Sequence, residues 1–446
     1  MNGPVVRRPS ESIIEMRTEK LLIRNAKQIV LVCNNKERVL CGEAMKNPVI
    51  LEQNSGSNGI SLVIGSDGLI KGIGSTATLT KGVRFNKIID ATGKCVIPGL
   101  VDGHTHPVWA GDRVHEFSLK LAGASYMDVH KAGGGINFTV EHTRKATEKE
   151  LYASLKQRLN GMLRCGTTLV ECKSGYGLNT ETEIKMLKVI QKAKKEMAID
   201  ISSTFCGAHS IPSDQTAESA TRDVIVNQLP EIQKLMEKGE LEVDNIDVFC
   251  EQGVFDINQS RRILDAGRKA GLALNFHGDE LHPMEAAELG GELKAEAVSH
   301  LEEISDAGMK AMAEAGSVAV ILPTTAYILR LKHPPVRKMI EQGVPVALGS
   351  DFNPNAFCMS MPLVMHLACV NLRMSMQEAL VAATINAAAS LCKSSTHGSI
   401  EVGKYGDVLI LDTPRWEHLV YQMANHERLI EYVIKQGDVA YQRDKR

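Results

Sequence analysis

The middle of the chain alternates between short apolar runs and stretches with helical periodicity, and this alternation constrains the fold more than any other feature of the sequence. Eight runs occur, at residues 96–101, 167–172, 201–208, 246–250, 272–277, 295–300, 317–322 and 345–351. Between them, Leu151, Leu155 and Leu159 recur every four residues, and Thr180 with Glu183 has the pattern of a capping box that opens a helix over 184–195. Further helices are predicted over 283–289, 306–315, 335–342 and 376–391. Eight strands that are each followed by a helix predict a (β/α)8 barrel, also called a TIM barrel.

A doubly wound sheet is the other fold that alternates strands with helices in this way. Such a sheet usually carries a glycine-rich phosphate-binding loop after an early strand. The sequence contains no loop of that kind. The barrel is therefore the favoured prediction.

The two ends of the chain have strand and turn character instead. Residues 20–95 contain apolar strand patterns separated by turns, with a polar stretch over 42–57 that is predicted to be a loop, and strand patterns return after 396. The simplest arrangement joins both ends into one small β-sandwich domain, with the barrel inserted between them. We therefore expect a disordered tail over 1–19, the two halves of the β-sandwich over 20–95 and 396–446, and the barrel over 96–395.

The composition favours a soluble enzyme. Hydrophobic residues make up 43% of the chain, charged residues 23%, and the formal net charge is -2. A nearly neutral chain gives no electrostatic reason to expect nucleic acid or a membrane surface as a partner. The sequence lacks a secretory signal and a long apolar span, and its ten cysteines contain no C-x-x-C pair, so a reducing cytosolic location is expected.

The first candidate for chemistry is the pair His104 and His106, which follows the first predicted barrel strand. Residues i and i+2 of an extended segment point to the same face, so both imidazoles can reach one ion. The pair also lies at the carboxyl end of its strand, where barrel enzymes place their active sites.

Three further strand ends carry polar side chains of the same kind. His277 ends the fifth run and is followed by Glu280, His300 ends the sixth, and Asp351 ends the eighth. Three histidines and one carboxylate suit zinc or ferrous iron. A metal in such a site lowers the pKa of its bound water from about 15.7 to near 7. Glu280 is placed to act as the general base; His300 could orient the attacked oxygen or donate a hydrogen bond, and Asp351 could bind the metal, orient the water, or do both.

Residues 91–106, which include His104-Thr105-His106, resemble the opening of the amidohydrolase superfamily. Residues 109–113, 173–178, 205–209 and 350–355 look more specifically like the imidazolonepropionase family, and the similarity extends from about residue 21 to 441. The resemblance implies a mononuclear zinc or iron site with the ligands His104, His106, His277 and Asp351. It also implies that Glu280 is the catalytic base and contacts the substrate, and that Arg113, Tyr176, His209, Asn353 and Asn355 bind the substrate.

The implied reaction is hydrolysis of the ring carbon–nitrogen bond of 4-imidazolone-5-propanoate to N-formimidoyl-L-glutamate, in histidine degradation. The implied assembly is a homodimer. Arg113 suits this substrate, because a guanidinium binds a propanoate carboxylate with two hydrogen bonds, although a surface ion pair with Asp112 or Glu116 is the simpler role for it. The predicted fourth strand, 246–251, has no lysine of the kind that is carboxylated in binuclear amidohydrolases, which favours one metal.

Three other functions remain to be separated from this one. A deaminase of the same superfamily would use the same metal and the same His277 and Glu280, but it would not need an arginine aimed at a carboxylate. A member without activity would lack a ligand or the base, and all are present. A structural zinc site would have a closed coordination shell, usually with cysteine.

Overall fold

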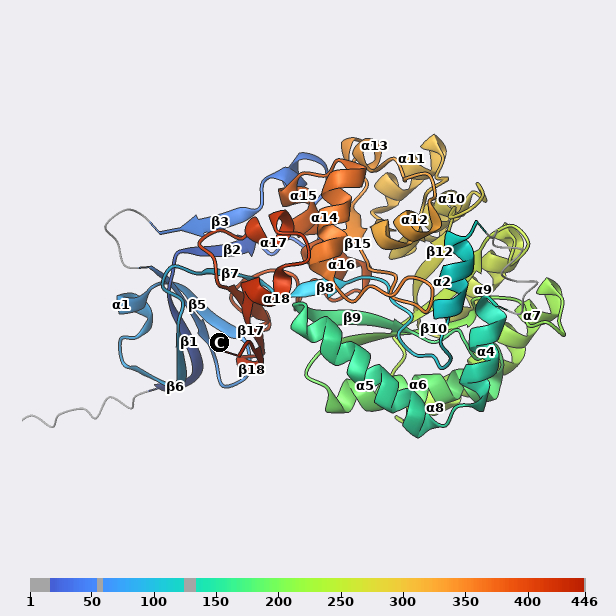
Figure 1. The fold of residues 1–446 in the computed structure, drawn as a ribbon, viewed down its shortest axis with the longest axis horizontal. Helices are drawn as coiled ribbons and strands as arrows, with labels where there is room; N and C mark the ends of the chain where they lie inside the picture. The colour runs from blue at the N-terminus through green and yellow to red at the C-terminus, as the bar shows by residue number, and fades with distance from the viewer. Residues whose placement is uncertain (1–16, 54–58, 124–133, 445–446) are drawn as a thin grey trace, which may run out of the picture.

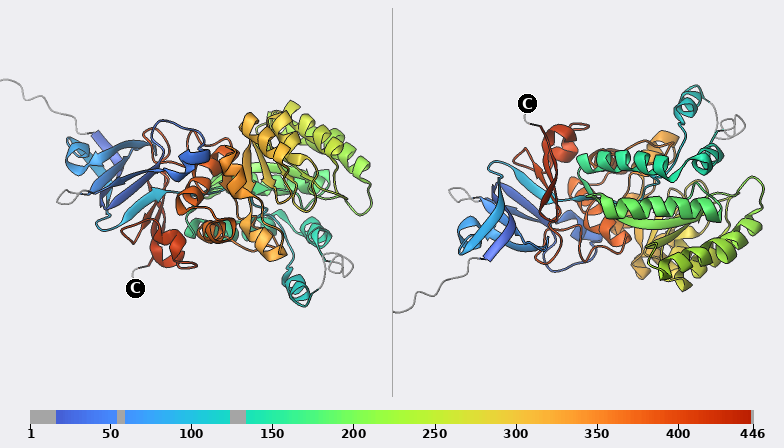
Figure 2. Two further views of the ribbon diagram at one scale, coloured as in Figure 1. Left: turned by 90° about the horizontal axis from the view of Figure 1, so that it is seen from above. Right: turned by 90° about the horizontal axis from the view of Figure 1, so that it is seen from below.

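The protein consists of a barrel of parallel strands and a pair of β-sheets that the two ends of the chain build together (Figure 1). The computed structural model describes residues 17–53, 59–123 and 134–444. In Figure 1 the blue and red segments from the two ends lie side by side on the left, and the barrel with its helices lies on the right. Figure 2 shows the same division from above and from below.

Eight parallel strands form the barrel, as the alternation of apolar runs predicts. In chain order they are β8 (Leu100–Asp102), β9 (Thr167–Lys173), β10 (Asp200–Ala208), β11 (Asn245–Cys250), β12 (Ala273–Gly278), β13 (Ala297–His300), β14 (Val318–Ile321) and β15 (Val346–Leu348). Each strand pairs with its neighbours in the sequence, from β8 to β15. Nearly all of their residues are buried, because strands of a barrel are covered on both faces.

The first and last strands meet just beyond their ends, which closes the barrel. The amide of Asp351 donates to the carbonyl of His104 at 2.9 Å, and the amide of His106 donates to the carbonyl of Phe352 at 2.8 Å. Beneath these bonds, Asp102 accepts hydrogen bonds from the amide and the hydroxyl of Ser350 at 2.8 and 2.5 Å. The closure therefore fixes the segments that carry His104, His106 and Asp351 against each other.

Helices surround the barrel. They are α2 (Val114–Leu121), α4 (Ile136–Lys145), α5 (Glu148–Arg164), α6 (Thr180–Glu196), α7 (Ala217–Asp223), α8 (Leu229–Glu237), α9 (Ile257–Lys269), α10 (Ala286–Leu293), α11 (Asp306–Ala315), α12 (Pro323–Leu329), α13 (Val336–Glu341), α14 (Met361–Leu372), α15 (Met376–Ala382) and α16 (Ile385–Ser390). On α5, Leu151, Leu155 and Leu159 are buried as their spacing predicts. Among the described residues, no helix combines the length and the apolar character needed to cross a bilayer.

Two helix predictions need correction. The N-cap of α6 is Asn179 rather than Thr180, and the carboxylate of Glu183 instead accepts hydrogen bonds from loop amides at residues 175, 177 and 178. The predicted helix over 376–391 is divided into α15 and α16. The break falls at Thr384, whose ψ of -98° is not helical, and the carbonyl of Ala383 accepts a hydrogen bond from the barrel strand β8 at Val101.

The run over 96–101 is also two strands rather than one. β7 (Cys95–Pro98) pairs with β16 and β2 outside the barrel, whereas β8 begins at Leu100. The chain passes from the outer sheet to the barrel at Gly99. The amide of Gly99 donates to the backbone carbonyl of Asp407, and a Cβ at this position would lie 2.0 Å from the hydroxyl of Thr168. An apolar run alone does not show that its two halves join different sheets.

The second part of the molecule consists of two sheets that share an apolar core. One sheet has the order β5-β4-β1-β6 and the other β18-β17-β16-β7-β2-β3. The strands are β1 (Arg17–Ala26), β2 (Gln28–Val32), β3 (Val49–Glu52), β4 (Ile60–Ile64), β5 (Ile70–Ser75), β6 (Val83–Asp90), β16 (Val408–Leu411), β17 (Ile430–Lys435) and β18 (Asp438–Gln442). Ile23, Leu62, Val96 and Ile410 lie in one hydrophobic cluster between the sheets. Both chain ends therefore contribute to this β-sandwich, as predicted.

Two sequence expectations fail at the edges of the sandwich. Residues 17–19, predicted as part of a tail, extend β1 through parallel pairing with β6, and the rest of that predicted tail lies outside the described residues. Residues 49–52, predicted as loop, form the edge strand β3. Edge strands are partly exposed and need no continuous apolar pattern, so their sequences do not distinguish them from loops. The remaining domain limits stay a prediction.

Candidate functional site

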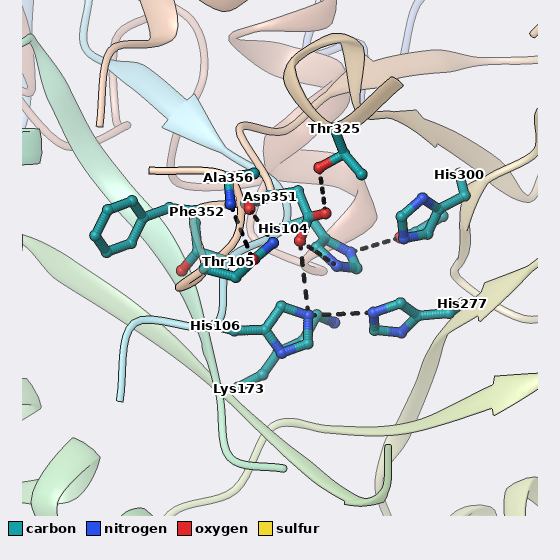
Figure 3. A network of polar contacts seen from close by, with 12 residues as sticks. His104, Thr105, His106, Lys173, His277, His300, Thr325, Asp351, Phe352 and Ala356 are labelled. Atoms are coloured by element: carbon teal, nitrogen blue, oxygen red, sulfur yellow. Dashed lines mark hydrogen bonds and ion pairs between the residues drawn. The ribbon is translucent and has the colours of Figure 1, made fainter. Parts of the chain in front are cut away.

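Four side chains from three strand ends of the barrel direct ligand atoms toward one point (Figure 3). Nε2 of His104 and Nε2 of His106 lie 3.6 and 3.7 Å from Oδ1 of Asp351. Nε2 of His277 lies 3.1 Å from Nε2 of His106. All four residues are at most 4% exposed. The four residues come from the ends of β8, β12 and β15, so the barrel strands bring together what the sequence keeps far apart.

For three of the four side chains, a neighbour bonds to the atom on the side away from this point and so fixes the orientation of the side chain. Nδ1 of His277 bonds to Asp247 at 2.8 Å, and Nδ1 of His104 bonds to the hydroxyl of Ser299 at 2.9 Å. The Thr325 hydroxyl donates to Oδ2 of Asp351 at 2.5 Å. Ring nitrogens that bind a metal usually have such partners on their other nitrogen.

This arrangement fits a divalent metal. Nε2 of His104 has no hydrogen-bond partner among the described residues. Among the same residues, the only atom within hydrogen-bond distance of Nε2 of His106 is Nε2 of His277. Two imidazole nitrogens without protons repel each other unless a cation lies near both. Ligands at about 2.1 Å from a tetrahedral zinc lie about 3.4 Å from one another, close to the distances found here.

His300 and His209 border the same point. A nitrogen of His300 lies within 4.8 Å of nitrogens of His104 and His277. A nitrogen of His209 lies within the same distance of nitrogens of His106 and His277. Nδ1 of His209 bonds to the carbonyl of Gly175 at 3.0 Å. The structure therefore places all the predicted histidines in a single cluster.

Burial keeps His104, His106 and His209 neutral. It lowers the pKa of His104 and His106 well below the usual value, and electrostatic interactions, with Lys173 for His104 and with His209 for His106, lower it further. Burial, and less strongly an electrostatic interaction with His277, lower the pKa of His209 to about 3. Neutral imidazole is the form that binds metals, so the environment favours ligation.

The backbone is strained where the site residues leave their strands. Asp351, Asp279 and His300 have φ values of 47°, 53° and 78°, in the left-handed region that residues other than glycine avoid. Such strain costs about 1–3 kcal/mol per residue and often occurs at functional sites.

A cavity of about 470 Å³ opens over the cluster. Besides His106, His277, His300 and Asp351, its lining includes the remaining predicted substrate and base residues, namely Arg113, Tyr176, His209, Glu280, Asn353 and Asn355. Glu280 lies 3.6 Å from Nε2 of His300, and burial raises its pKa well above the usual value, assisted by the charges of Glu302, Asp351 and Glu251. Phe249, Ile136 and Leu329 add apolar surface to the cavity wall, which also includes Thr325 and Arg330.

Arg113 forms an ion pair and also lines the cavity. Its Nη2 lies 2.7 Å from Oε2 of Glu116, so the ion pair exists. The pair is buried rather than on the surface, because Arg113 is 8% and Glu116 1% exposed. Arg113 also lines the cavity, and its Nε has no hydrogen-bond partner among the described residues. It can therefore present further N–H groups to an anion.

Asn353 and Asn355 first of all shape the loop after β15. The Asn353 side chain donates to the carbonyl of Asp351 at 2.7 Å and accepts from the amide of Asn355 at 2.7 Å. Both residues still line the cavity. This turn places Asp351 and the two amides on one rigid loop.

Sequence reasoning missed a charged network beneath the histidines. Lys173, at the end of β9, lies 2.8 Å from Glu171 and 2.7 Å from Asp247, and all three side chains are completely buried. The two carboxylates raise the pKa of Lys173 against the effect of burial, which keeps it charged. Asp247 and Glu171 interrupt otherwise apolar runs, and this interruption is the signal that could have revealed them.

Comparison with known proteins agrees with the geometry. The amidohydrolase family model matches residues 95–440. The chain is 62% identical to the probable imidazolonepropionase of Mus musculus, over 96% of this chain and 99% of the relative. It is 63% identical to that of Nematostella vectensis, over 95% and 99%, and 54% identical to that of Dictyostelium discoideum, over 95% and 98%.

Solved structures support the fold. An adenosine deaminase from Xanthomonas campestris with bound zinc aligns with a TM-score of 0.68 and 16% identity, over 96% of this chain and 94% of that one. The guanine deaminase of E. coli aligns with a TM-score of 0.65 and 17% identity, over 95% and 99%. With the family model and the near-complete relatives, these findings establish that the chain belongs to the amidohydrolase family and, within it, to the imidazolonepropionases.

Proposed function

We propose that the chain hydrolyses the ring carbon–nitrogen bond of 4-imidazolone-5-propanoate to N-formimidoyl-L-glutamate, a step of histidine degradation. The names of the near-complete relatives support this activity. One structural observation supports the substrate most directly. The cavity above the histidine cluster is also lined by Arg113, so one ligand can touch the reactive centre and a cation at once.

His104, His106, His277 and Asp351 would hold one zinc or iron ion. Their four ligand atoms face one point, and neighbours hold the other polar atoms of His104, His277 and Asp351. The ion would supply a water nucleophile at neutral pH and a positive charge next to the ring carbonyl. Neutral ring nitrogens and a carboxylate suit either metal.

The protein groups manage the protons of the reaction. Glu280 takes a proton from the attacking water, whose oxygen bonds to the ring carbonyl carbon. As the carbon–nitrogen bond breaks, Glu280 returns that proton to the leaving ring nitrogen. Nε2 of His300, 3.6 Å from Glu280, stabilises the oxygen on which charge develops, and Asp351 helps to orient the water.

The other cavity residues would select the substrate. The Arg113 guanidinium binds the propanoate carboxylate through charge-assisted hydrogen bonds. Tyr176, on the loop that Glu183 holds, and His209 contact the ring and the carboxylate. Asn353 and Asn355 also contact the substrate. We further expect a homodimer in the cytosol, with a small-molecule substrate and neither nucleic acid nor a membrane as a partner.

The test is turnover of freshly prepared 4-imidazolone-5-propanoate by purified protein whose metal content has been measured. We expect ultraviolet loss of the substrate, formation of N-formimidoyl-L-glutamate, and about one metal ion per chain. Removal of the metal with a chelator should abolish turnover, and zinc or ferrous iron should restore it. Release of ammonia from aminopurines or related bases, with no imidazolone turnover, would instead identify a deaminase.

The role of Glu280 has a separate test. The Glu280→Gln variant keeps the shape of the side chain but cannot accept a proton, so kcat should fall by about 100-fold or more. Metal content should remain at the wild-type level, because Glu280 is not one of the four ligands. Wild-type kcat with the metal bound would remove Glu280 from the base role.

A further inference from the structure

Glu302, two residues after His300, is a buried carboxyl group for which the mechanism above has no use. It is 1% exposed, and neither of its carboxylate oxygens receives a hydrogen bond from the side chain or backbone of another described residue. Buried glutamates are nearly always paired, because desolvation of an unpaired carboxyl group is costly. A residue with no structural partner at this depth calls for a functional explanation.

The position of Glu302 points to His300. Its Oε2 lies 3.8 Å from Nδ1 of His300, and that nitrogen likewise has no hydrogen-bond partner among the described residues. On the other side of the ring, Nε2 lies 3.6 Å from Glu280. The imidazole therefore lies between two carboxyl groups, one at the cavity and one behind it. Hydrogen bonds of catalytic groups are often long before the substrate binds and shorten in the complex.

The backbone that carries Glu302 is strained. His300 and Leu301 have φ values of 78° and 70°, two successive left-handed residues without glycine. Two backbone hydrogen bonds hold this turn against the end of β12. The amide of Leu301 donates to the carbonyl of Gly278 at 3.2 Å, and the amide of Glu303 donates to the carbonyl of Asp279 at 2.8 Å. The turn thus places Glu302 behind the ring at an energetic cost, which is typical of functional sites.

The electrostatic surroundings agree with this position. Burial raises the pKa of Glu302 to about 8; its own backbone amide opposes the rise, and the charges of Asp351 and Glu303 add to it. Glu302 is in turn the charged neighbour that raises the pKa of Glu280 most. Glu302 is therefore coupled to the site although it does not line the cavity.

We propose that Glu302 is a positioning residue that hydrogen-bonds Nδ1 of His300 and thereby holds the ring with Nε2 directed at Glu280 and the reacting carbonyl. This inference rests on the proposed function. Glu302 does not touch the substrate or the metal. Its effect is to select one orientation of the His300 ring.

Two substitutions separate positioning from a structural role. Glu302→Met fills the same space without hydrogen-bonding groups, and kcat should fall by about 10- to 100-fold with KM and metal content close to wild type. Its melting temperature should equal or exceed that of the wild type, because an unpaired buried carboxyl group has been replaced by an apolar one. Glu302→Gln retains an amide that can bond to Nδ1 and should recover most of the lost kcat.

Glu303→Gln is the matched control. Glu303 is the next residue, partly exposed and 3.3 Å from Lys332, so the variant removes a carboxyl group from the same turn. It should keep wild-type kcat and KM. A Glu302→Met enzyme with wild-type kcat would overturn the inference, as would parallel losses of melting temperature and kcat that Glu302→Gln does not relieve. If Glu302→Met fails to fold, wild-type kcat in Glu302→Ala decides against the inference in the same way.

The two proposals can fail separately. If the wild type does not turn over the imidazolone, the proposed function falls before any variant is compared. If the wild type is active and all Glu302 variants match it, only the positioning role of Glu302 falls.

Discussion

Arg113 meets two demands that usually conflict, since it is buried and yet must remain available to an anion. Glu116, 2.7 Å away, compensates its charge and makes burial tolerable. The second carboxylate oxygen of Glu116 accepts from the amide of Gly135 at 2.9 Å, which ties the pair to the start of α4. The guanidinium is thus oriented before any ligand arrives, and a planar group that is already fixed loses little entropy on binding a carboxylate.

Replacement of this arginine should affect binding rather than chemistry. We expect Arg113→Ala to raise KM by about 10- to 100-fold, the value of charge-assisted hydrogen bonds, with a smaller change in kcat and no loss of metal. Steady-state kinetics and metal analysis would measure this. The exposed Arg373, which does not line the cavity, gives the control variant Arg373→Ala. An unchanged KM in Arg113→Ala would show that the carboxylate binds elsewhere.

Among the elements of the fold, the barrel strands were the most predictable from sequence. Strands such as β12 and β13 are buried on both faces, so their sequences begin with apolar residues, and each carries a histidine at or next to its carboxyl end. This pattern revealed His277 and His300 as well as the strands. It did not reveal that 96–101 is divided at Gly99, because both halves are apolar and only the pairing of their backbones differs.

The partners of the site residues were not predictable in the same way. Asp247 reaches His277 from the neighbouring strand β11, and Ser299 reaches His104 from β13, which is not a neighbour of β8; no local sequence pattern specifies either contact. Glu302 was hidden for another reason. Its position behind His300 depends on left-handed φ values at two residues that rarely adopt them. The sequence therefore predicted several of the side chains that line the cavity, but not the partners of those side chains.

The contact between β11 and β12 gives a prediction at this scale. Asp247→Ala removes the acceptor that orients His277, and we expect the affinity for the metal to fall by about 10- to 100-fold. Competition with a chromophoric chelator would measure it. Asp247→Asn keeps an acceptor oxygen, so its metal affinity should lie between those of the wild type and Asp247→Ala. Asp256→Ala, which removes the N-cap of α9, should lower stability but leave metal affinity unchanged.

The barrel and the β-sandwich are also joined by a cluster of charges, in which Lys435 and Asp407 are buried and the Asp200 side chain is 33% exposed. Asp200, the first residue of β10, lies 2.7 Å from Nε2 of His397 and 2.7 Å from Nζ of Lys435, which is on β17. Lys435 also pairs with Asp407. Burial alone would raise the pKa of Asp200, but the hydrogen bond from His397 and the charge of Lys435 outweigh it and lower the pKa to about 2. The ionised carboxylate therefore stabilises the junction of the two parts.

The pH dependence of stability should report this junction. An unfolded aspartate has a pKa of about 3.9, so the folded protein binds the proton of Asp200 more weakly than the unfolded chain does. The contribution of ionised Asp200 to the free energy of unfolding is complete above about pH 5 and is lost as the pH falls through about 4 toward 2. Asp200→Asn should thus lower the free energy of unfolding by about 1 kcal/mol at pH 7, and by less at pH 3.

Denaturant unfolding of the metal-free wild type and variant at several pH values would measure the difference. Asp438→Asn is the control, because Asp438 is 74% exposed in its ion pair with Lys20 and should contribute little. A difference that does not change between pH 7 and pH 3 would mean that Asp200 acts through something other than its charge.

The closure of the barrel has a consequence for how the protein is made. Asp102 and Ser350, which join the first strand to the last, are separated by 248 residues, and His104 and Asp351 follow directly after them. While the ribosome is still synthesising the chain, the histidines emerge long before the carboxylate that completes their set. The nascent chain therefore cannot form the complete site until the eighth strand has left the exit tunnel, so full metal loading belongs to the last stage of synthesis or follows it.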